Sequence, residues 1–264
     1  MKGGRAGGRR LRRAVAAAAA LLGAALARPA AADERCGGHP ALAVGERLVF
    51  EVSWLGIPAG RATLAIEGVT EVDGRLALRL ASAADSNKLV DTVYKVRDRA
   101  ESLVDCAGRH SLRFVLRTEE GRRRRERDYT FDPARQEIVL LRPGEVPLRL
   151  PAPGPVQDPL SSLYYVRTQP LEVGRSLYVA TLQGTQVWQL EVQVLRREAV
   201  EVPAGRFDAI VVKPLLRGEG LFRHKGDVVV WLTDDARRMP VRMTTSVAIG
   251  SVAAELTSYE SPAR

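Results

Sequence analysis

The chain has 264 residues, of which 45% are hydrophobic and 27% charged, and its formal net charge is +9. Residues 1–32 hold seven of the 40 Lys and Arg residues and no Asp or Glu, so residues 33–264 carry 33 basic against 31 acidic side chains. This near balance excludes the broadly basic surface that is typical of nucleic-acid-binding proteins, and we expect no nucleic-acid partner.

The first 32 residues have the pattern of a cleavable export signal. A basic segment is followed by an apolar stretch at 14–27 and by an A-x-A cleavage site at 30–32. The apolar stretch is shorter than the roughly 20 residues that span a bilayer as a helix. We therefore predict a signal-peptide helix in residues 1–32 and a periplasmic protein. The pair Arg9 and Arg10 leaves the twin-arginine route open beside the general secretory route.

The two cysteines, Cys36 and Cys106, are predicted to form a disulfide. An exported chain reaches an oxidising compartment, in which disulfides persist. The bond would tie the start of the mature chain to its body, and the closed loop would be worth about 4 kcal/mol in the chain-entropy model. Two free thiols remain the alternative.

Short segments in which apolar and polar residues alternate follow one another along the mature chain. Residues 48–54 alternate as in a half-buried strand. Gly56–Gly60 and Asp73–Gly74 then supply the turn residues of hairpins. Val228–Leu232 is an unbroken apolar run that predicts a central strand. The predicted strands are at residues 48–54, 62–66, 76–80, 94–100, 112–116, 122–131, 177–181, 187–194, 207–212, 228–232, 241–245 and 252–258.

One helix is predicted in the mature chain. Asp158 is a good N-cap, and Pro159 at the first helical position costs little because its missing N–H would have no partner. Long side chains recur on one side at Leu160, Leu163, Tyr164 and Arg167. Pro170 stops the helix, which we expect to close over a sheet face or an opening.

Strands that recur about every eight to twelve residues are typical of antiparallel sandwiches, barrels and curved sheets. We predict an all-β fold, an antiparallel curved sheet or an incomplete β-barrel or sandwich, with one short helix after residue 158. Residues 33–264 are expected to form a single β-rich domain. The Pro- and Gly-rich segment at 142–157 could separate two half-sheets, but neither half alternates strongly enough to bury both of its faces alone.

Several sequence blocks occur in one order that resembles the bacterial exported family catalogued as domain of unknown function 3108. The blocks are Phe50–Gly60, Ser86–Lys88, Tyr94–Asp98, Gln157–Tyr165, Val202–Asp208, Trp231–Asp235 and Arg238–Arg242. The resemblance covers roughly residues 45–259. It implies an envelope protein of antiparallel β structure, and it implies no activity or catalytic residues.

Four aromatic residues are candidates to line a ligand cavity: Trp54, Tyr94, Tyr164 and Trp231. Packing in the core is the alternative for the tryptophans. The run from Arg122 to Arg125 lies in a predicted strand, so its side chains should point alternately to both faces. We expect a solvated strand that resists edge pairing. The alternative is a contact of Arg122, Arg123, Arg124 and Arg125 with an anionic head group of a phospholipid or lipopolysaccharide.

The first functional hypothesis is a binding or carrier protein for an apolar or envelope-derived ligand, with the predicted helix as a lid and peripheral membrane contact. The second is a structural or assembly module that binds another envelope protein. The third is an envelope hydrolase that uses Asp234, Asp235 or His224, although adjacent turn aspartates usually cap backbone groups. His39, His110 and His224 are too widely spaced to predict a metal site, and no cofactor is expected.

Overall fold

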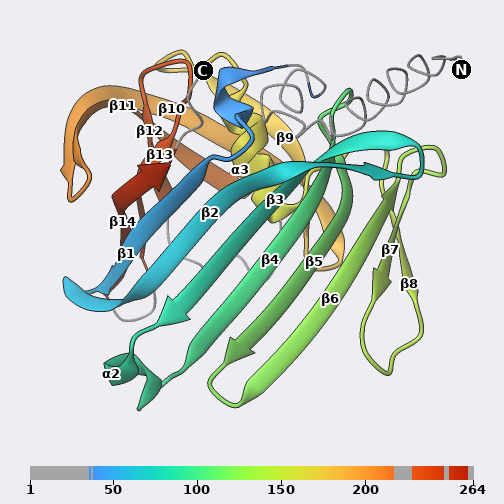
Figure 1. The fold of residues 1–264 in the computed structure, drawn as a ribbon. Coiled ribbons are helices and arrows are strands. Elements are labelled where there is room, and N and C mark those ends of the chain that lie inside the picture. The colour runs from blue at the N-terminus through green and yellow to red at the C-terminus, as the bar shows by residue number, and fades with distance from the viewer. Residues whose placement is uncertain (1–35, 37, 217–227, 247–249, 261–264) are drawn as a thin grey trace, which may run out of the picture.

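The fold is that of a computed structural model, which describes residues 36, 38–216, 228–246 and 250–260 (Figure 1). The predicted signal peptide lies outside the described residues. The first half of the fold comprises a 3-10 helix η1 (Pro40–Leu42), β1 (Arg47–Trp54), β2 (Ile57–Val72), β3 (Arg75–Ser86), α2 (Lys88–Asp91), β4 (Val96–Asp105), β5 (Ser111–Glu120), β6 (Arg123–Asp132), β7 (Glu137–Leu141) and β8 (Leu148–Pro151). The second half comprises α3 (Pro159–Arg167), β9 (Ser176–Gln183), β10 (Gln186–Val202), β11 (Gly205–Leu216), β12 (Val228–Thr233), β13 (Pro240–Ser246) and β14 (Ser251–Glu260).

All strands in the described part of the chain belong to one 14-stranded sheet, with the order β8-β7-β6-β5-β4-β3-β2-β1-β14-β13-β12-β11-β10-β9. Each half is a meander of antiparallel neighbours, as short hairpin turns favour. The halves are joined where the first strand pairs with the last, from Arg47 opposite Glu260 to Trp54 opposite Val252. The sheet is open, with β8 and β9 at its edges, and it curves around α3 (Figure 1). The predicted fold class is confirmed.

The segment between β8 and α3 connects distant parts of the curved sheet. The carbonyl of Val156 accepts a hydrogen bond from the backbone of Ser111, which begins β5. Gln157 forms a parallel bridge to Thr181 on the edge strand β9. The hydroxyl of Tyr129 on β6 donates to the carbonyl of Gly184, 3.0 Å away in the β9–β10 turn. These contacts hold the curve at one end without closing the sheet into a barrel.

The helix α3 packs against the face of the sheet that we call the inner face. Leu160 and Tyr164 share a buried cluster with inner-face residues of β1 to β5, and Val166 belongs to a second cluster on β9 to β12. The hollow beside Tyr164 has a volume of about 10 Å³, which is room for about one water molecule. The helix therefore closes over a sheet face, which is one of the two positions predicted for it, and the hollow beside Tyr164 is too small to hold a ligand larger than water.

Polar side chains fix both ends of α3. The N-cap Asp158 is completely buried, and its carboxylate accepts from the backbone of Leu160 and Ser161 and from the hydroxyls of Ser102 and Ser111. Burial raises the pKa of this carboxyl, against the opposing effect of the serine hydrogen bonds. Ser102 and Ser111 lie on β4 and β5, so the start of the helix is attached to the first half of the sheet.

The disulfide between Cys36 and Cys106 is present, with the two Cα atoms 4.6 Å apart. It links the start of the described chain to the residue that follows β4, as predicted. One local expectation is wrong, and β7 and β8 are strands that the sequence analysis did not predict. The strand expected from residue 94 begins at Val96, because Asn87 caps a short helix, α2, that the sequence pattern did not indicate.

Candidate functional site

The four candidate cavity aromatics do not come together in the fold. Tyr164 is buried in the core on α3, and burial raises the pKa of its hydroxyl. Trp231 lies on the outer face of the sheet, where its indole Nε1 donates to Glu198 at 2.7 Å and the guanidinium of Arg242 lies 5.8 Å from the ring centroid. Trp231 therefore does not point to the inner face, and it packs against the main buried cluster, as the alternative of core packing predicts.

The register of the sheet explains the position of Trp231. Trp231 is opposite Arg242, which is opposite Glu255, which is opposite Glu51 on β1. These residues share one face, and the neighbouring Phe50, fully buried, points to the other. The residues of β12 are apolar on both faces, so the sequence pattern alone does not show which of them point to the inner face.

Trp54 and Tyr94 lie at the end of the sheet formed by the β1–β2 turn, α2 and the β5–β6 turn (Figure 1). Trp54 is opposite Val252, and it follows Val52, which is opposite Ala254 on the inner face. Tyr94 is half exposed in the connection from α2 to β4. Of the four candidates, these two are accessible at the same end of the molecule.

The inner face changes character along its strands. On β3, Leu78 and Leu80 are buried, whereas Ser82 and Ala84 further along the same face are smaller and partly exposed. β2 shows the same change from Leu64 to Ala62, and β14 from Leu256 to Ala254. We call this part of the inner face the open strip, which consists of Val52, Ala62, Ser82, Ala84, Leu116 and Ala254.

Cross-strand neighbours make the open strip continuous. Val52 is opposite Ala254, and Ala62 is opposite Ala84. Ser82 and Leu116 flank Ala100, which is buried between them on β4. The strip therefore crosses from β14 to β5 as a largely apolar surface on which four of the six side chains are Ala or Ser, beyond the part of the inner face that α3 covers.

One acidic group borders this surface. Asp98 is opposite Ala84 on β3 and Thr118 on β5. Burial, and then the nearby carboxylate of Glu120, raise the pKa of Asp98, while a hydrogen bond from the backbone of Glu119 opposes the change. The group is thus protonated more readily than an ordinary aspartate.

The arginine run lies at the same end as Trp54 and Tyr94, and its side chains alternate between the faces. Arg124 is opposite Glu119, and its Nη2 lies 3.3 Å from the Glu119 carboxylate. Arg123 and Arg125 are opposite Glu120 and Thr118 and point to the other face. Arg122 lies in the β5–β6 turn, and all four arginines are exposed.

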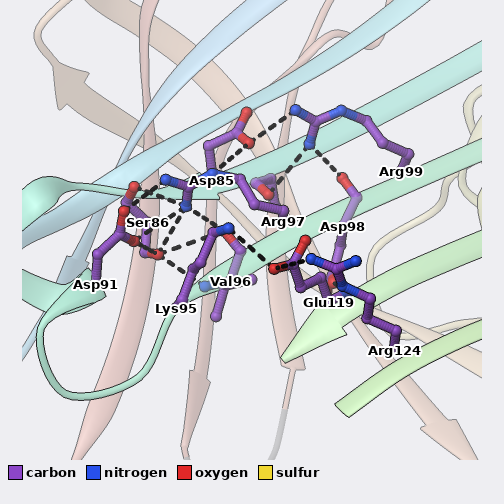
Figure 2. A network of polar contacts seen from close by, with 11 residues as sticks. Asp85, Ser86, Asp91, Lys95, Val96, Arg97, Asp98, Arg99, Glu119 and Arg124 are labelled. Atoms are coloured by element: carbon purple, nitrogen blue, oxygen red, sulfur yellow. Dashed lines mark hydrogen bonds and ion pairs between the residues drawn. The ribbon is translucent and has the colours of Figure 1, made fainter. Parts of the chain in front are cut away.

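A polar network covers the outer side of this end (Figure 2). Lys95 is 2.9 Å from Glu119, and its hydrogen bond is the main cause that lowers the pKa of that carboxyl. Arg97 is 2.6 Å from Asp91, whose pKa it lowers, and it lies 3.5 Å from Asp85. The network joins α2 to β3, β4 and β5.

The hydrolase candidates are engaged in structural contacts. Asp234 is 2.7 Å from the guanidinium of Arg197, and Asp235 accepts from the Thr233 hydroxyl and from the backbone of Arg237 and Arg238. His39 caps η1 and His110 is buried, while His224 lies outside the described residues. In the part of the chain that the structure describes, no group of three or more His, Cys, Asp or Glu side chains could hold a metal ion.

Sequence reasoning missed two features of this region. Asn87 was part of a recognised block, and an Asn just before the segment Lys88–Asp91 was an available signal for a helix N-cap. The sequence contains no signal that Leu89 and Val93 are exposed, because the sequence of a short connection does not distinguish a buried apolar residue from an exposed one. No described helix is long and apolar enough to cross a membrane.

Three solved structures that match this chain are distant from it in sequence. A β-barrel-like protein of domain of unknown function DUF1849 from Brucella abortus superposes with a TM-score of 0.53 at 12% identity, over 84% of this chain and 99% of that one. A candidate lipoprotein from Parabacteroides distasonis ATCC 8503 gives a TM-score of 0.35 at 9% identity, over 83% and 96% of the two chains. A candidate exported protein with a YmcC-like fold from Bacteroides fragilis NCTC 9343 gives 0.33 at 8%, over 82% and 96%.

The first of these likenesses supports the β-barrel-like fold and no activity. No curated protein matches the sequence significantly. The model of one protein family matches residues 49–257, which is most of the chain and nearly all of its described sheet. The chain therefore belongs to the family of proteins of unknown function DUF3108.

Proposed function

We propose that the protein is an exported, periplasmic binding or carrier protein that holds an apolar ligand, such as an acyl chain from the envelope, on the open strip. One observation carries the proposal: side chains of the inner face are large and buried beside α3 but small and partly exposed further along the same strands. Because the side chains are small, they leave space for a ligand on this concave surface. A ligand that removes this surface from water is stabilised by a binding free energy of about 25 cal/mol per Å² of apolar area buried.

The position of α3 limits where such a ligand can lie. The hollow between α3 and β3 has room for about one water molecule, so an acyl chain does not fit beneath the helix. We therefore propose that the ligand lies beyond the helix, between β14 and β5, with α3 as the filled end of the curve. Trp54 lies at the end of the open strip that is far from α3, and it supplies an aromatic contact for the ligand.

The sheet edges give less support to an assembly module that pairs strands with another protein. β8 has four residues and ends at Pro151, which has no N–H to donate. β9 is partly covered by the bridge from Gln157. Short and covered edges are features that prevent strand pairing.

The test is native mass spectrometry of the mature protein purified from periplasm. We expect the wild type to carry an apolar ligand and Ala84→Trp, which fills the open strip, to retain at least about tenfold less. Ala83→Trp is the matched control, because Ala83 is also partly exposed and points to the opposite face of the same strand. Ala254→Phe and Ala253→Phe repeat the comparison on β14. A wild type without ligand, or equal loss in both members of each pair, would refute the proposal.

A further inference from the structure

Six large apolar side chains project from the end of the sheet that holds the open strip. Val93 is 88% exposed, Leu89 69% and Ile57 57%. We call the set the apolar rim, which consists of Trp54, Leu55, Ile57, Leu89, Val93 and Tyr94. A cluster of exposed apolar side chains is unusual on a soluble protein and marks an interaction surface.

The segments that carry the apolar rim are in contact with one another. The backbone and the side-chain amide of Asn87, which precedes α2, donate to the carbonyls of Ala59 and Pro58 at 2.8 and 2.6 Å. The ring of Tyr94 lies against Gly121 in the β5–β6 turn, where an added Cβ would be 3.2 Å from it. The β1–β2 turn, α2 and the β5–β6 turn thus form one end of the molecule, which is visible in Figure 1.

The polar network of Figure 2 holds α2 in place. Asp91 at the end of α2 pairs with Arg97 and accepts from the hydroxyl of Ser86. Asn87 caps the helix by accepting from the backbone of Val90 at 2.9 Å. These contacts fix both ends of a four-residue helix that would be unstable alone. Leu89 and Val93 are therefore presented by a fixed frame.

Basic side chains outnumber acidic ones on the side of the apolar rim formed by α2 and the β5–β6 turn. Residues 85–99 and 119–125 contain eight basic and five acidic side chains, whereas the β1–β2 turn at 54–58 has no charge. Asp85, Asp91 and Glu119 are neutralised by ion pairs. Among the described residues, four cations at this end make no ion pair: Lys88, Arg122, Arg123 and Arg125.

We propose that this end of the molecule docks on a lipid bilayer surface that carries anionic head groups. The apolar rim enters the boundary between head groups and acyl chains, where Trp and Tyr are favoured, and the four unpaired cations contact phosphates. Apolar side chains flanked on one side by unpaired cations complement such a surface in both polarity and charge. The inference goes beyond ligand binding on the open strip and does not require it, although docking at this end would bring the strip to the membrane.

The experiment is flotation of the mature protein with vesicles of phosphatidylcholine alone or mixed with phosphatidylglycerol. We expect binding to the mixed vesicles that weakens as salt is added. The pair Leu89→Glu and Val93→Glu should weaken binding by about tenfold or more. Val173→Glu, at an exposed valine between α3 and β9, is the control and should bind like the wild type.

The cations are tested separately. Arg122→Ser with Arg123→Ser should weaken binding by about fivefold per charge. Arg135→Ser is the control, because Arg135 is exposed in the β6–β7 turn at the other end of β6 and should leave binding unchanged. Circular dichroism and thermal melting check that each variant is folded, which the exposure of these positions favours.

The proposal would be overturned if the wild type did not bind the mixed vesicles, even if crosslinking captured a protein partner at this end. It would also be overturned if the rim variants bound these vesicles as the wild type does. Ala84→Trp should bind vesicles normally while losing its ligand. Failure of membrane docking is thereby distinguished from failure of ligand binding.

Discussion

The guanidinium of Arg167 and the carboxylate of Glu46 form a buried ion pair with two hydrogen bonds. Nη1 donates to Oε1 at 2.7 Å and Nη2 to Oε2 at 2.6 Å, and both side chains are almost completely shielded from solvent. Nη2 also donates to the carbonyl of Arg237, in the turn between β12 and β13. The C-terminal end of α3 is thus attached to the entry of β1 and to the second half of the sheet, while Asp158 attaches its other end to the first half.

Removing one partner of this pair should destabilise the protein strongly. We expect Arg167→Met to lower the free energy of unfolding by about 3–5 kcal/mol, because Glu46 would remain buried without a cation. The double variant Arg167→Met with Glu46→Leu should recover much of the loss. Urea unfolding of residues 33–264 measures both. A single variant as stable as the wild type would show that the pair is not buried in solution.

The raised pKa of Asp158 predicts a pH dependence of stability. A carboxyl whose folded pKa lies above its ordinary value of 3.8 keeps its proton longer in the folded state, so its contribution is full at low pH and is lost as the pH rises through the folded pKa. Asp158→Asn retains a cap oxygen for Leu160 and Ser161 and cannot ionise. Relative to this variant, the wild type should lose stability as the pH rises above about 4. Parallel stability curves for the two proteins would contradict the prediction.

The disulfide should contribute substantially to stability, because Cys36 and Cys106 are 70 residues apart. We expect Cys36→Ser with Cys106→Ser to lower the free energy of unfolding by up to about 4 kcal/mol. Wild type reduced with dithiothreitol is the matched control and should behave like the double variant in urea. If oxidised and reduced wild type unfolded together, the bond would have no role in stability.

The three tryptophans should respond differently to a membrane. With Trp188→Phe and Trp231→Phe, only Trp54 remains, and its emission should shift to the blue when anionic vesicles are added, since its ring enters a less polar medium. With Trp54→Phe and Trp188→Phe, only Trp231 remains, and we expect no shift because it is held on the outer face by Glu198 and Arg242. The reverse pattern would place the docking surface on the outer face of the second half of the sheet.

Most of the strands, their hairpin order and the helix after Asp158 were predictable because each depends on local chemistry, whereas β7 and β8 were not predicted. Period-two alternation, Asp-Gly turns and an Asp-Pro helix start act over a few residues. The predicted pairing of Cys36 with Cys106 rested only on the predicted export signal and the cysteine count. The sequence also predicted that the arginine run could not lie on a single face, because neighbours in a strand point apart.

Three features depended on the tertiary structure. They are the face of the sheet on which Trp231 lies, the packing of α3 against the inner face, and the exposure of the apolar rim. The inward or outward direction of Trp231 is set by register across many strands, with a bulge beside it between Trp231 and Leu232. Whether Leu89 and Val93 are buried depends on what the curved sheet brings near α2, and the network around Arg97 joins residues that local patterns cannot relate. Local sequence determines which residues form strands, but the sum of twists, bulges and pairings decides which side chains meet and which remain exposed.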